Sequence, residues 1–582
     1  MLPRLGHYLT GLLTIQSAFA NPVSSAAYGK PSSPAIEPGH RGAVASESEI
    51  CSNIGTGLLK EGGNAADALV GTVFCIGVIG MYHSGLGGGG FMLVRAPNGT
   101  YEFIDFRETA PAAAFEDMYK NNVDASLEGG LASGVPGEVR GLEYLHANYG
   151  TLPWAKVLAP AIKVARYGWT VNADLVRYMQ SAIATAGQNS TSNFLVDDLE
   201  FAIDFAPKGR LLQLNETITR KRYANTLETI ANDGPDAFYE GPIAEATIKA
   251  LQAQNGTMTL EDLKNYTVAL RKPSTITYRD YKLTACSAPS GGEVALSVLK
   301  IMEGYSDVGD PANVNLTTHR LDESMRFAYG ERTNLGDPLF LEGINKYQEQ
   351  MLSEETAKEI RAKIKDTQTF GVEYYDPKGI ESLETPGTSH VVTADHTGMS
   401  VTLTTTVNLL FGSQLVVPET GVIMNNEMND FSIPNTTNAF GYIPSPANFI
   451  RPGKRPLSSI SPVIVEHLNS TLLNSFYVAI GAAGGSRIIT ATIQNLIHIL
   501  DGGLTPAEAL AQPRLHDQLV PAVVSFEYAY DNSTTAFMKD LGHNVSWVAP
   551  GQSTAQGLRR LPNGTFEAAG EPRQSNSGGF VV

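Results

Sequence analysis

One stretch in the second half of the chain limits the possible folds most strongly, because it has the pattern of a β-hairpin. Residues 390–394 and 399–404 are rich in strand-forming residues, and the turn-forming sequence Asp-His-Thr-Gly separates them. Folding at this turn places Thr388 opposite Thr405 or Thr406. Two hydroxyl groups are therefore predicted to meet at one end of the hairpin.

Length and composition indicate a large globular protein. The chain has 582 residues, of which 42% are apolar and 8% aromatic, and domains usually contain about 100–200 residues. Its formal net charge of −17 and isoelectric point near 5.2 argue against nucleic acids and anionic membranes as partners, because both require a basic face.

Residues 1–20 have the pattern of a secretory signal peptide. Arg4 precedes a short apolar run that ends in Ala18-Phe19-Ala20, a small-x-small cleavage sequence. The competing interpretation is a retained membrane anchor, which needs about 20 mostly apolar residues. Polar residues interrupt this run, so we expect cleavage after Ala20 and no transmembrane span in the mature protein.

Glycosylation sequences also favour the secretory pathway. Together with the leader they predict a glycoprotein that is secreted or delivered to a vacuolar lumen, with these loops exposed. The candidate sites are Asn98, Asn189, Asn215, Asn255, Asn265, Asn315, Asn435, Asn469, Asn532, Asn544 and Asn563.

The three cysteines allow one disulfide bond and exclude a zinc site built from a cluster of thiolates. Residues 48–60 have a helical pattern, a Gly-Gly pair ends it, and Asn64 is placed to cap a second helix. Antiparallel packing of these helices brings Cys51 beside Cys75, so we predict this disulfide over two free buried thiols. Cys286 is then predicted to be buried and unpaired.

A glycine-rich stretch matches a dinucleotide-binding motif in its spacing only. Gly85, Gly87 and Gly90 follow the G-x-G-x-x-G pattern, but residues 91–95 favour a strand where the motif requires a helix. We interpret the glycines as a tight backbone bend between core elements. We expect the protein to use neither a cofactor nor a metal ion.

The rest of the chain offers a scaffold and few chemical signals. Residues 130–270 alternate amphipathic helical patterns with Gly and Pro breaks, whereas residues 340–387 are polar and have the pattern of a loop. Residues 101–106 favour a strand that ends at Arg107. Because Glu108 follows it, the local sequence alone indicates a surface ion pair at this arginine.

Six separated motifs stand out along the chain, at residues 105–111, 387–390, 406–413, 425–431, 452–459 and 484–485. In this order they resemble the motifs of the γ-glutamyltransferases, a family of N-terminal-nucleophile hydrolases. The resemblance covers nearly the whole chain after the leader and implies an α+β fold, a four-layer αββα sandwich. It also implies a precursor that cuts itself between Gly387 and Thr388 into a large chain (21–387) and a small catalytic chain (388–582), which form one domain.

The implied cut would activate Thr388. A threonine hydroxyl is a weak nucleophile without a base, and in the precursor the nitrogen of Thr388 is an amide that cannot accept a proton. Cleavage frees an α-amine with an ordinary pKa of about 7.7–8.0, which can act as general base near neutral pH. By resemblance, Thr406 hydrogen-bonds the Thr388 end, in agreement with the hairpin pairing.

The resemblance also implies a receptor for a γ-glutamyl group. Arg107, Ser458 and Ser459 would bind the α-carboxylate, since a guanidinium fork and two hydroxyls suit two oxygens. The residues that would hold the α-ammonium group are Asn408, Glu427 and Asp430. By spacing alone, two acids three positions apart are typical of a solvated turn.

The oxyanion and the lid complete the implied site. Backbone N–H groups of Gly484 and Gly485 would stabilise the tetrahedral oxyanion, although the same pattern fits a simple turn before a helix. The long segment 432–456 would form a lid, with Phe440 covering the substrate. The substrates implied are glutathione and related γ-glutamyl compounds, and water, an amino acid or a dipeptide would accept the acyl group.

Two other functions fit parts of this pattern. A β-lactam acylase of the same fold would need a different side-chain pocket. The residues that argue against it are Arg107, Glu427, Asp430, Ser458 and Ser459. An uncleaved, inactive relative would instead serve as a secreted binding glycoprotein.

Overall fold

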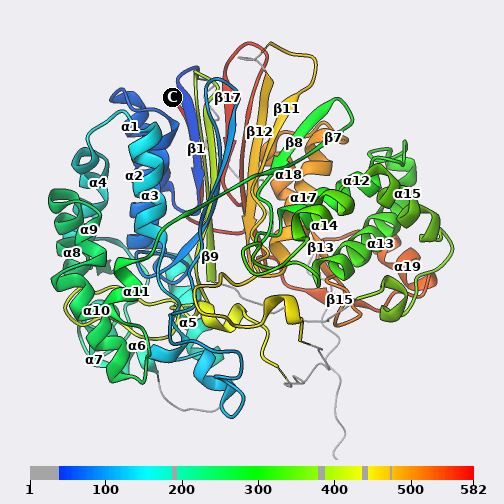
Figure 1. Ribbon diagram of the computed structural model, residues 1–582. Helices are drawn as coiled ribbons and strands as arrows, with labels where there is room; N and C mark the ends of the chain where they lie inside the picture. Colours follow the sequence, from blue (N-terminus) through cyan, green and yellow to red (C-terminus); the bar gives the residue numbers. More distant parts are fainter. Residues whose placement is uncertain (1–38, 187–192, 378–386, 435–443, 472–474) are drawn as a thin grey trace, which may run out of the picture. The chain divides into compact units, whose positions relative to one another are not determined.

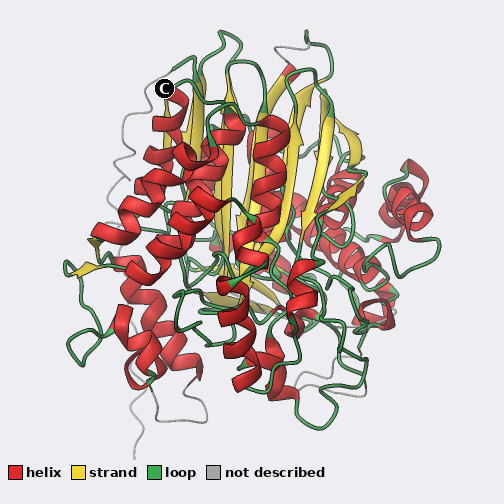
Figure 2. Ribbon diagram, turned by 60° about the vertical axis from the view of Figure 1, so that its left-hand side comes forward, coloured by secondary structure: helices red, strands yellow, loops and turns green. Residues whose placement is uncertain are grey.

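Two facing β-sheets, each covered on its outer side by helices, form the structure (Figure 1, Figure 2). This is the predicted four-layer αββα sandwich. The computed structural model describes residues 39–186, 193–377, 387–434, 444–471 and 475–582.

The first sheet has seven strands among the described residues, and the predicted hairpin lies at its centre. The strands, in spatial order, are β18 (Gly578–Val581), β1 (Gly42–Ser46), β9 (Gly387–Asp395), β10 (Ser400–Asn408), β2 (Gly89–Arg95), β3 (Tyr101–Phe106) and β6 (Ala269–Arg271). The register pairs Thr388 with Thr406, which confirms the predicted pairing.

The second sheet has six strands in the described part of the chain. Their order is β17 (Phe566–Ala569), β16 (Thr554–Arg560), β12 (Phe476–Ala483), β11 (Val463–His467), β8 (Tyr281–Ala285) and β7 (Ser274–Tyr278). Smaller sheets contain β4 (Trp169–Thr170) with β5 (Thr217–Ile218), and β13 (Leu515–His516) with β14 (Val524–Glu527) and β15 (Val545–Val548).

Helices from different parts of the chain cover the two sheets. Those on the first sheet's side are α1 (Glu49–Lys60), α2 (Ala65–Ile79), α3 (Glu138–Tyr149), α4 (Trp154–Tyr167), α5 (Ala173–Ala186), α6 (Phe194–Asp197), α7 (Leu199–Phe205), α8 (Lys221–Asp233), α9 (Asp236–Tyr239), α10 (Pro242–Ala253) and α11 (Leu260–Lys264). Those on the second sheet's side are α12 (Gly292–Met302), α13 (Val314–Arg332), α14 (Ile344–Met351), α15 (Glu354–Lys363), α17 (Arg487–Leu500), α18 (Pro506–Ala511) and α19 (Asn532–Asp540).

Side chains that point to alternate faces of each strand form the two cores between the layers. In β2, Met92 and Val94 join the core beneath the first helical layer, whereas Phe91 and Leu93 join the core between the sheets. All strand residues from 387 to 395 are buried, so both faces of β9 are covered. The hairpin is therefore held inside the sandwich on every side.

The predicted helix pair and disulfide are confirmed. Ser48 caps α1, and Asn64 caps α2 in a capping box. The Cα atoms of Cys51 and Cys75 lie 5.3 Å apart across the disulfide, and Cys286 is a buried free cysteine.

The expectation of a loop between residues 340 and 387 is wrong in part. α14 and α15 lie within it, because Ile344, Met351 and Ile360 supply a buried face that outweighs the polar composition. Residues 364–377 contain the 3₁₀ turn η4 (Val372–Tyr375), in which Tyr375 is buried, and residues 378–386 lie outside the described residues.

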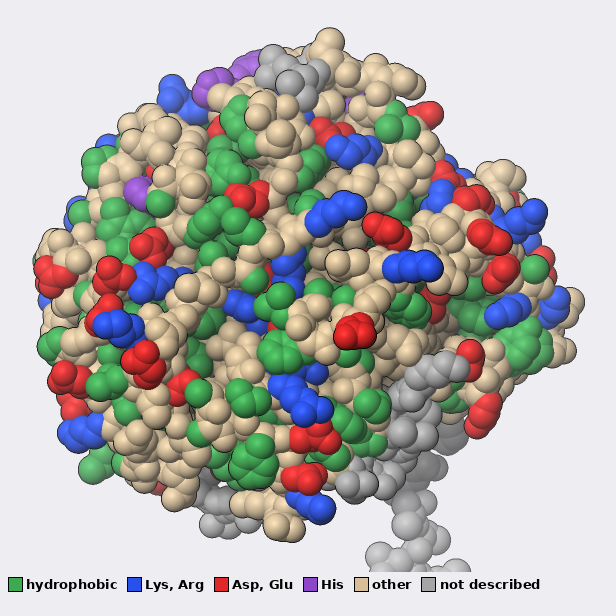
Figure 3. Space-filling view, in the orientation of Figure 1, with side chains coloured by type: hydrophobic (Ala, Val, Ile, Leu, Met, Phe, Trp, Pro, Cys, Tyr) green, Lys and Arg blue, Asp and Glu red, His purple; other side chains and the backbone are tan. Residues whose placement is uncertain are grey.

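Surface features agree with the composition. Figure 3 shows acidic and basic side chains interspersed over one face, without a large basic patch. Among the described residues, no helix combines the length and apolarity needed to cross a membrane.

Most of the candidate glycosylation sites are exposed. Asn315 is half-buried, and Asn189, Asn435 and the predicted leader lie outside the described residues. The exposed sites are Asn98, Asn215, Asn255, Asn265, Asn469, Asn532, Asn544 and Asn563.

The glycine-rich stretch is a point of close backbone approach, and a strand follows it, as predicted. A Cβ atom at Gly88 would lie 2.0 Å from the carbonyl oxygen of Thr406, and one at Gly87 would lie 2.1 Å from that of Ile423. The glycines thus let the backbone reach the end of the central hairpin.

Replacing Gly88 with alanine is expected to lower the thermal unfolding midpoint, because the new methyl group would cost about 1–3 kcal/mol or more of overpacking. Gly57 in α1 is the matched control. An alanine there meets nothing within 4 Å and gains up to about 1 kcal/mol of helix propensity. Equal midpoints for the two variants, measured by circular dichroism, would contradict the close approach.

Candidate active site

Thr388 is the second residue of the central strand β9, and the Thr406 hydroxyl contacts the peptide group before it. The Thr406 hydroxyl donates a hydrogen bond to the carbonyl oxygen of Gly387 at 2.5 Å and accepts one from the backbone N–H of Asn408 at 2.7 Å. The sheet register shifts between Thr406 and Asn408, where Asn408 has a φ of 74°. This bulge turns the Thr406 hydroxyl toward the bond before Thr388.

Arg107 is buried at the end of β3, so the local interpretation as a surface ion pair is wrong. Its side chain is 1% exposed and forms ion pairs with Glu427 and Asp430, more than 300 positions away. Burial opposes the charge, but the two carboxylates hold the pKa of the guanidinium above its ordinary value. The structure thus brings together three of the residues that the resemblance selects.

The acids lie in a 3₁₀ turn, η5 (Glu427–Asp430), in which Glu427 is buried and Asp430 is largely buried, and not in a solvated turn. Glu427 is 1% exposed, and burial raises the pKa of its carboxyl group although Arg107 opposes the shift. Two asparagine side chains tie the segment that leads into this turn to the hairpin and to the glycine-rich stretch. The side-chain N–H of Asn408 donates to the carbonyl oxygen of Asn426 at 2.9 Å, and Asn425 donates to Gly87 at 2.7 Å.

The two serines lie on a segment that also reaches Arg107. The Arg107 Nε donates to the carbonyl oxygen of Pro456 at 3.4 Å, two residues before Ser458. Ser458 is buried, and its hydroxyl accepts from the N–H of Ile460, whereas the Ser459 hydroxyl accepts from Arg332 at 3.3 Å. The segment that carries both serines thus contacts Arg107 through Pro456, and the serine hydroxyls have other partners.

Gly484 and Gly485 lie at the same end of the sandwich as Thr388. Arg95 bonds both Gly398, at the hairpin turn, and Ser475, next to the start of β12. The start of β9 and the end of β12 therefore lie together at the other end of the strands, which is the lower end of the sheets in Figure 1. Both glycines have positive φ values, 120° and 59°, in the turn before α17.

A second charge cluster, which the sequence reasoning missed, supports Arg107. Asp105 accepts from the backbone N–H of Arg107 at 3.0 Å and pairs with Arg271 at 2.6 Å and Arg455 at 3.3 Å. Arg271 also pairs with Asp337 at 2.9 Å. The available signal was that Asp105 and Arg455 lie inside the motifs that contain the site residues.

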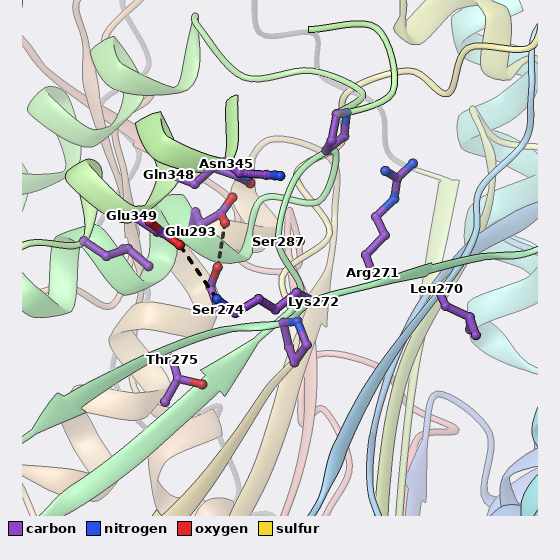
Figure 4. A pocket seen from close by; sticks show the side chains of 13 residues that line it. Leu270, Arg271, Lys272, Ser274, Thr275, Ser287, Glu293, Asn345, Gln348 and Glu349 are labelled. Carbon is purple, nitrogen blue, oxygen red and sulfur yellow. Dashed lines mark hydrogen bonds and ion pairs between the residues drawn. The ribbon is translucent and has the colours of Figure 1, made fainter. Parts of the chain in front are cut away.

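Arg271 also lines a polar pocket of about 630 Å³ between β6 and α14 (Figure 4). There the Ser274 hydroxyl donates to Glu293 at 2.6 Å, and burial raises the pKa of Glu293 to about 8. Glu108 is a further buried acid beside Arg107, with its pKa raised to about 8 by burial. Phe440 of the expected lid lies outside the described residues.

The αββα sandwich with a threonine at the start of a central strand defines an N-terminal-nucleophile hydrolase. The family model described as "Gamma-glutamyltranspeptidase" matches residues 51–581. The chain therefore belongs to the gamma-glutamyltranspeptidase family.

Known proteins similar to the chain agree with this assignment. It is 53% identical to a glutathione hydrolase proenzyme of Arthroderma benhamiae, over 100% of both chains, and 49% identical to a glutathione hydrolase of Aspergillus flavus, over 95% of this chain and 93% of the relative. Among solved structures, a cephalosporin acylase from Bacillus halodurans has a TM-score of 0.82 at 26% identity, covering 97% of this chain and 99% of that one.

Replacing Arg107 with methionine is expected to destabilise the fold by about 3–5 kcal/mol, because it leaves Glu427 and Asp430 without their buried cation. Arg166→Met is the control, since its pair with Glu228 is at the surface and worth about 1 kcal/mol or less.

The loss should depend on pH. A buried unpaired carboxyl group has a folded-state pKa above its unfolded value, so the stability of the Arg107→Met variant should rise as the pH falls from 8 to 5. Thermal unfolding midpoints across this range test the prediction. A deficit that stays constant with pH would contradict charge burial as its cause.

Proposed function

We propose that this enzyme cleaves γ-glutamyl amides through an ester on Thr388, after cutting its own chain before that residue. The arrangement of Thr388, Arg107, Glu427 and Asp430 at one end of the sandwich carries the proposal. The similar fungal proteins are named glutathione hydrolases. Glutathione and related γ-glutamyl compounds are therefore the proposed substrates. Products of the cut would be a large chain (21–387) and a small chain (388–582).

The self-cleavage step starts at the Gly387 carbonyl group. The Thr388 hydroxyl adds to the carbonyl carbon, the C–N bond breaks, and the Thr388 nitrogen takes the hydroxyl proton. Water then hydrolyses the resulting ester and leaves a free amine on Thr388. The Thr406 hydroxyl already donates to the Gly387 oxygen, so it supports the negative charge that develops there.

The free amine then acts as the base for substrate. It accepts the Thr388 hydroxyl proton as the oxygen attacks the γ-carbonyl carbon, and the proton passes to the leaving amine. Gly484 and Gly485 would supply backbone donors to the oxyanion, each worth roughly 3–4 kcal/mol in comparable sites. Water, an amino acid or a dipeptide would finally take the γ-glutamyl group from Thr388.

Charge complementarity supports the γ-glutamyl specificity. The α-carboxylate would face Arg107, together with Ser458 and Ser459, and the α-ammonium group would face Glu427 and Asp430 with Asn408 nearby. A zwitterion can insert between these groups and leave every buried charge paired. The glutaryl group of a β-lactam acylase substrate has no ammonium group and would leave the acids unpaired.

Replacing Thr388 with alanine is expected to abolish both the cut and activity. N-terminal sequencing of the purified wild-type protein should give two sequences, beginning at Asn21 and at Thr388, and the variant should give only the first. Turnover of a γ-glutamyl anilide, with a glutaryl β-lactam as comparison, measures activity. Two chains in the Thr388→Ala variant, or preference for the β-lactam, would refute the proposal.

Two Thr406 variants should distinguish the effect of the hydroxyl group on self-cleavage from the effect of side-chain volume. Thr406→Ala is expected to slow self-cleavage by about 10²–10³-fold, because it removes a donor to the developing oxyanion. Thr406→Ser keeps the hydroxyl and should cut at a rate near that of the wild type. Band intensities on denaturing gels over time give the rates, and equal rates for Thr406→Ala and Thr406→Ser would remove Thr406 from this role.

A further inference from the structure

A buried cluster outside the active site brings together two histidines and a glutamate. His319 and Glu323 lie one turn apart on α13, and His543 follows α19. One potential ligand atom from each lies within 4.8 Å of the others, and at most 4% of any of the three residues is exposed. Imidazole and carboxylate are ligands that zinc and similar divalent metals prefer.

The outer nitrogens of both imidazoles contact acceptors. The Nε2 atom of His319 lies 2.8 Å from the carbonyl oxygen of Lys365, which can only accept a hydrogen bond. The Nδ1 atom of His543 lies 3.0 Å from a carboxylate oxygen of Asp322. The carbonyl oxygen of Lys365 holds the proton of His319 on Nε2, whereas the Nδ1 of His543 forms no hydrogen bond among the described residues and its contact with Asp322 is electrostatic. A carbonyl or carboxylate behind each imidazole is the usual arrangement of metal-binding histidines.

The inner nitrogens of the two imidazoles lie close together. The Nδ1 of His319 and the Nε2 of His543 are 2.8 Å apart, and without a metal one proton on the His543 Nε2 can join them. A cation can take the place of that proton, because His543 can carry its own proton on Nδ1, which faces Asp322. Two nitrogens on a tetrahedral zinc ion are about 3.3 Å apart, so a small opening of the pair would accommodate it.

The surrounding charge also favours a divalent cation. Three buried carboxylates, Asp322, Glu323 and Asp517, face one buried guanidinium, that of Arg326. If all four are ionised, their formal charge is −2. One oxygen of Glu323 accepts from Thr369 and Tyr375 at 2.6 and 2.8 Å, and the other has no hydrogen-bond partner among the described residues.

We propose that His319, Glu323 and His543 bind one divalent transition-metal ion of the zinc type. The sequence reasoning expected no metal because it considered clusters of thiolates. The site would be structural, since it lies in the outer helical layer of the second sheet, on α13 and beside α19 (Figure 1). If the chain is cut before Thr388, which rests on the proposed function, two ligands belong to the large chain and His543 to the small one.

Metal binding tests the proposal directly. The purified full chain is stripped with a chelator, incubated with Zn²⁺ and gel-filtered, and its zinc is measured by mass spectrometry. We expect about one ion per protein, a higher thermal unfolding midpoint, and for Co²⁺ the absorption of a tetrahedral site. His319→Gln and His543→Gln should lose the ion. His146→Gln, a histidine that also contacts a backbone carbonyl, should keep it.

Two further variants keep the test decisive. Asp322→Asn alters only the carboxylate behind His543 and should weaken zinc affinity about 10–100-fold, even if the histidine variants fold poorly. The uncut Thr388→Ala chain should bind zinc equally, so failure of the proposed cleavage would not affect the result. The proposal would be overturned if the wild type bound no zinc. It would also be overturned if the folded His543→Gln and Asp322→Asn variants bound as much zinc as the wild type, with the same affinity.

Discussion

Burial of the Arg107 charge is the constraint on which the active end of the molecule depends. A guanidinium removed from water must be paired, and its partners come from a segment more than 300 positions away. The same constraint extends behind it, because Asp105 links the Arg107 backbone to Arg271 and Arg455. Strand β3, turn η5 and the segment before β11 are thus fixed around one charge.

Ion pairs that form when no substrate is bound explain how these charged side chains can be buried. Arg107 pairs with both acids, so without substrate each of the three charged groups has an opposite charge beside it. A ligand that presents one negative and one positive group exchanges these partners for its own. Ligands with a single charge leave at least one buried group exposed to the low dielectric, and this cost provides discrimination.

Local features of the fold could be predicted from the sequence, whereas long-range electrostatics could not. The hairpin register and the caps at Ser48 and Asn64 depend on residues close in sequence, and the structure confirms them. Arg107 looked like a surface residue because nothing nearby in the chain reveals Glu427. Only the resemblance to a family connected them. The cluster at His319 and His543 escaped for the same reason, since 224 positions separate its imidazoles.

The order of strands in the first sheet has a consequence for the processed enzyme. The hairpin β9–β10 lies between β1 and β2, and β18 borders β1 on the other side, so strands from the two sides of the cut are interleaved in one sheet. Neither product of the cut could then complete this sheet alone. Unfolding of the mature enzyme would release two separate molecules, and its recovery would become a second-order reaction whose rate falls with dilution. Maturation would thus convert a fold that one chain can regain alone into one that returns only when two chains meet.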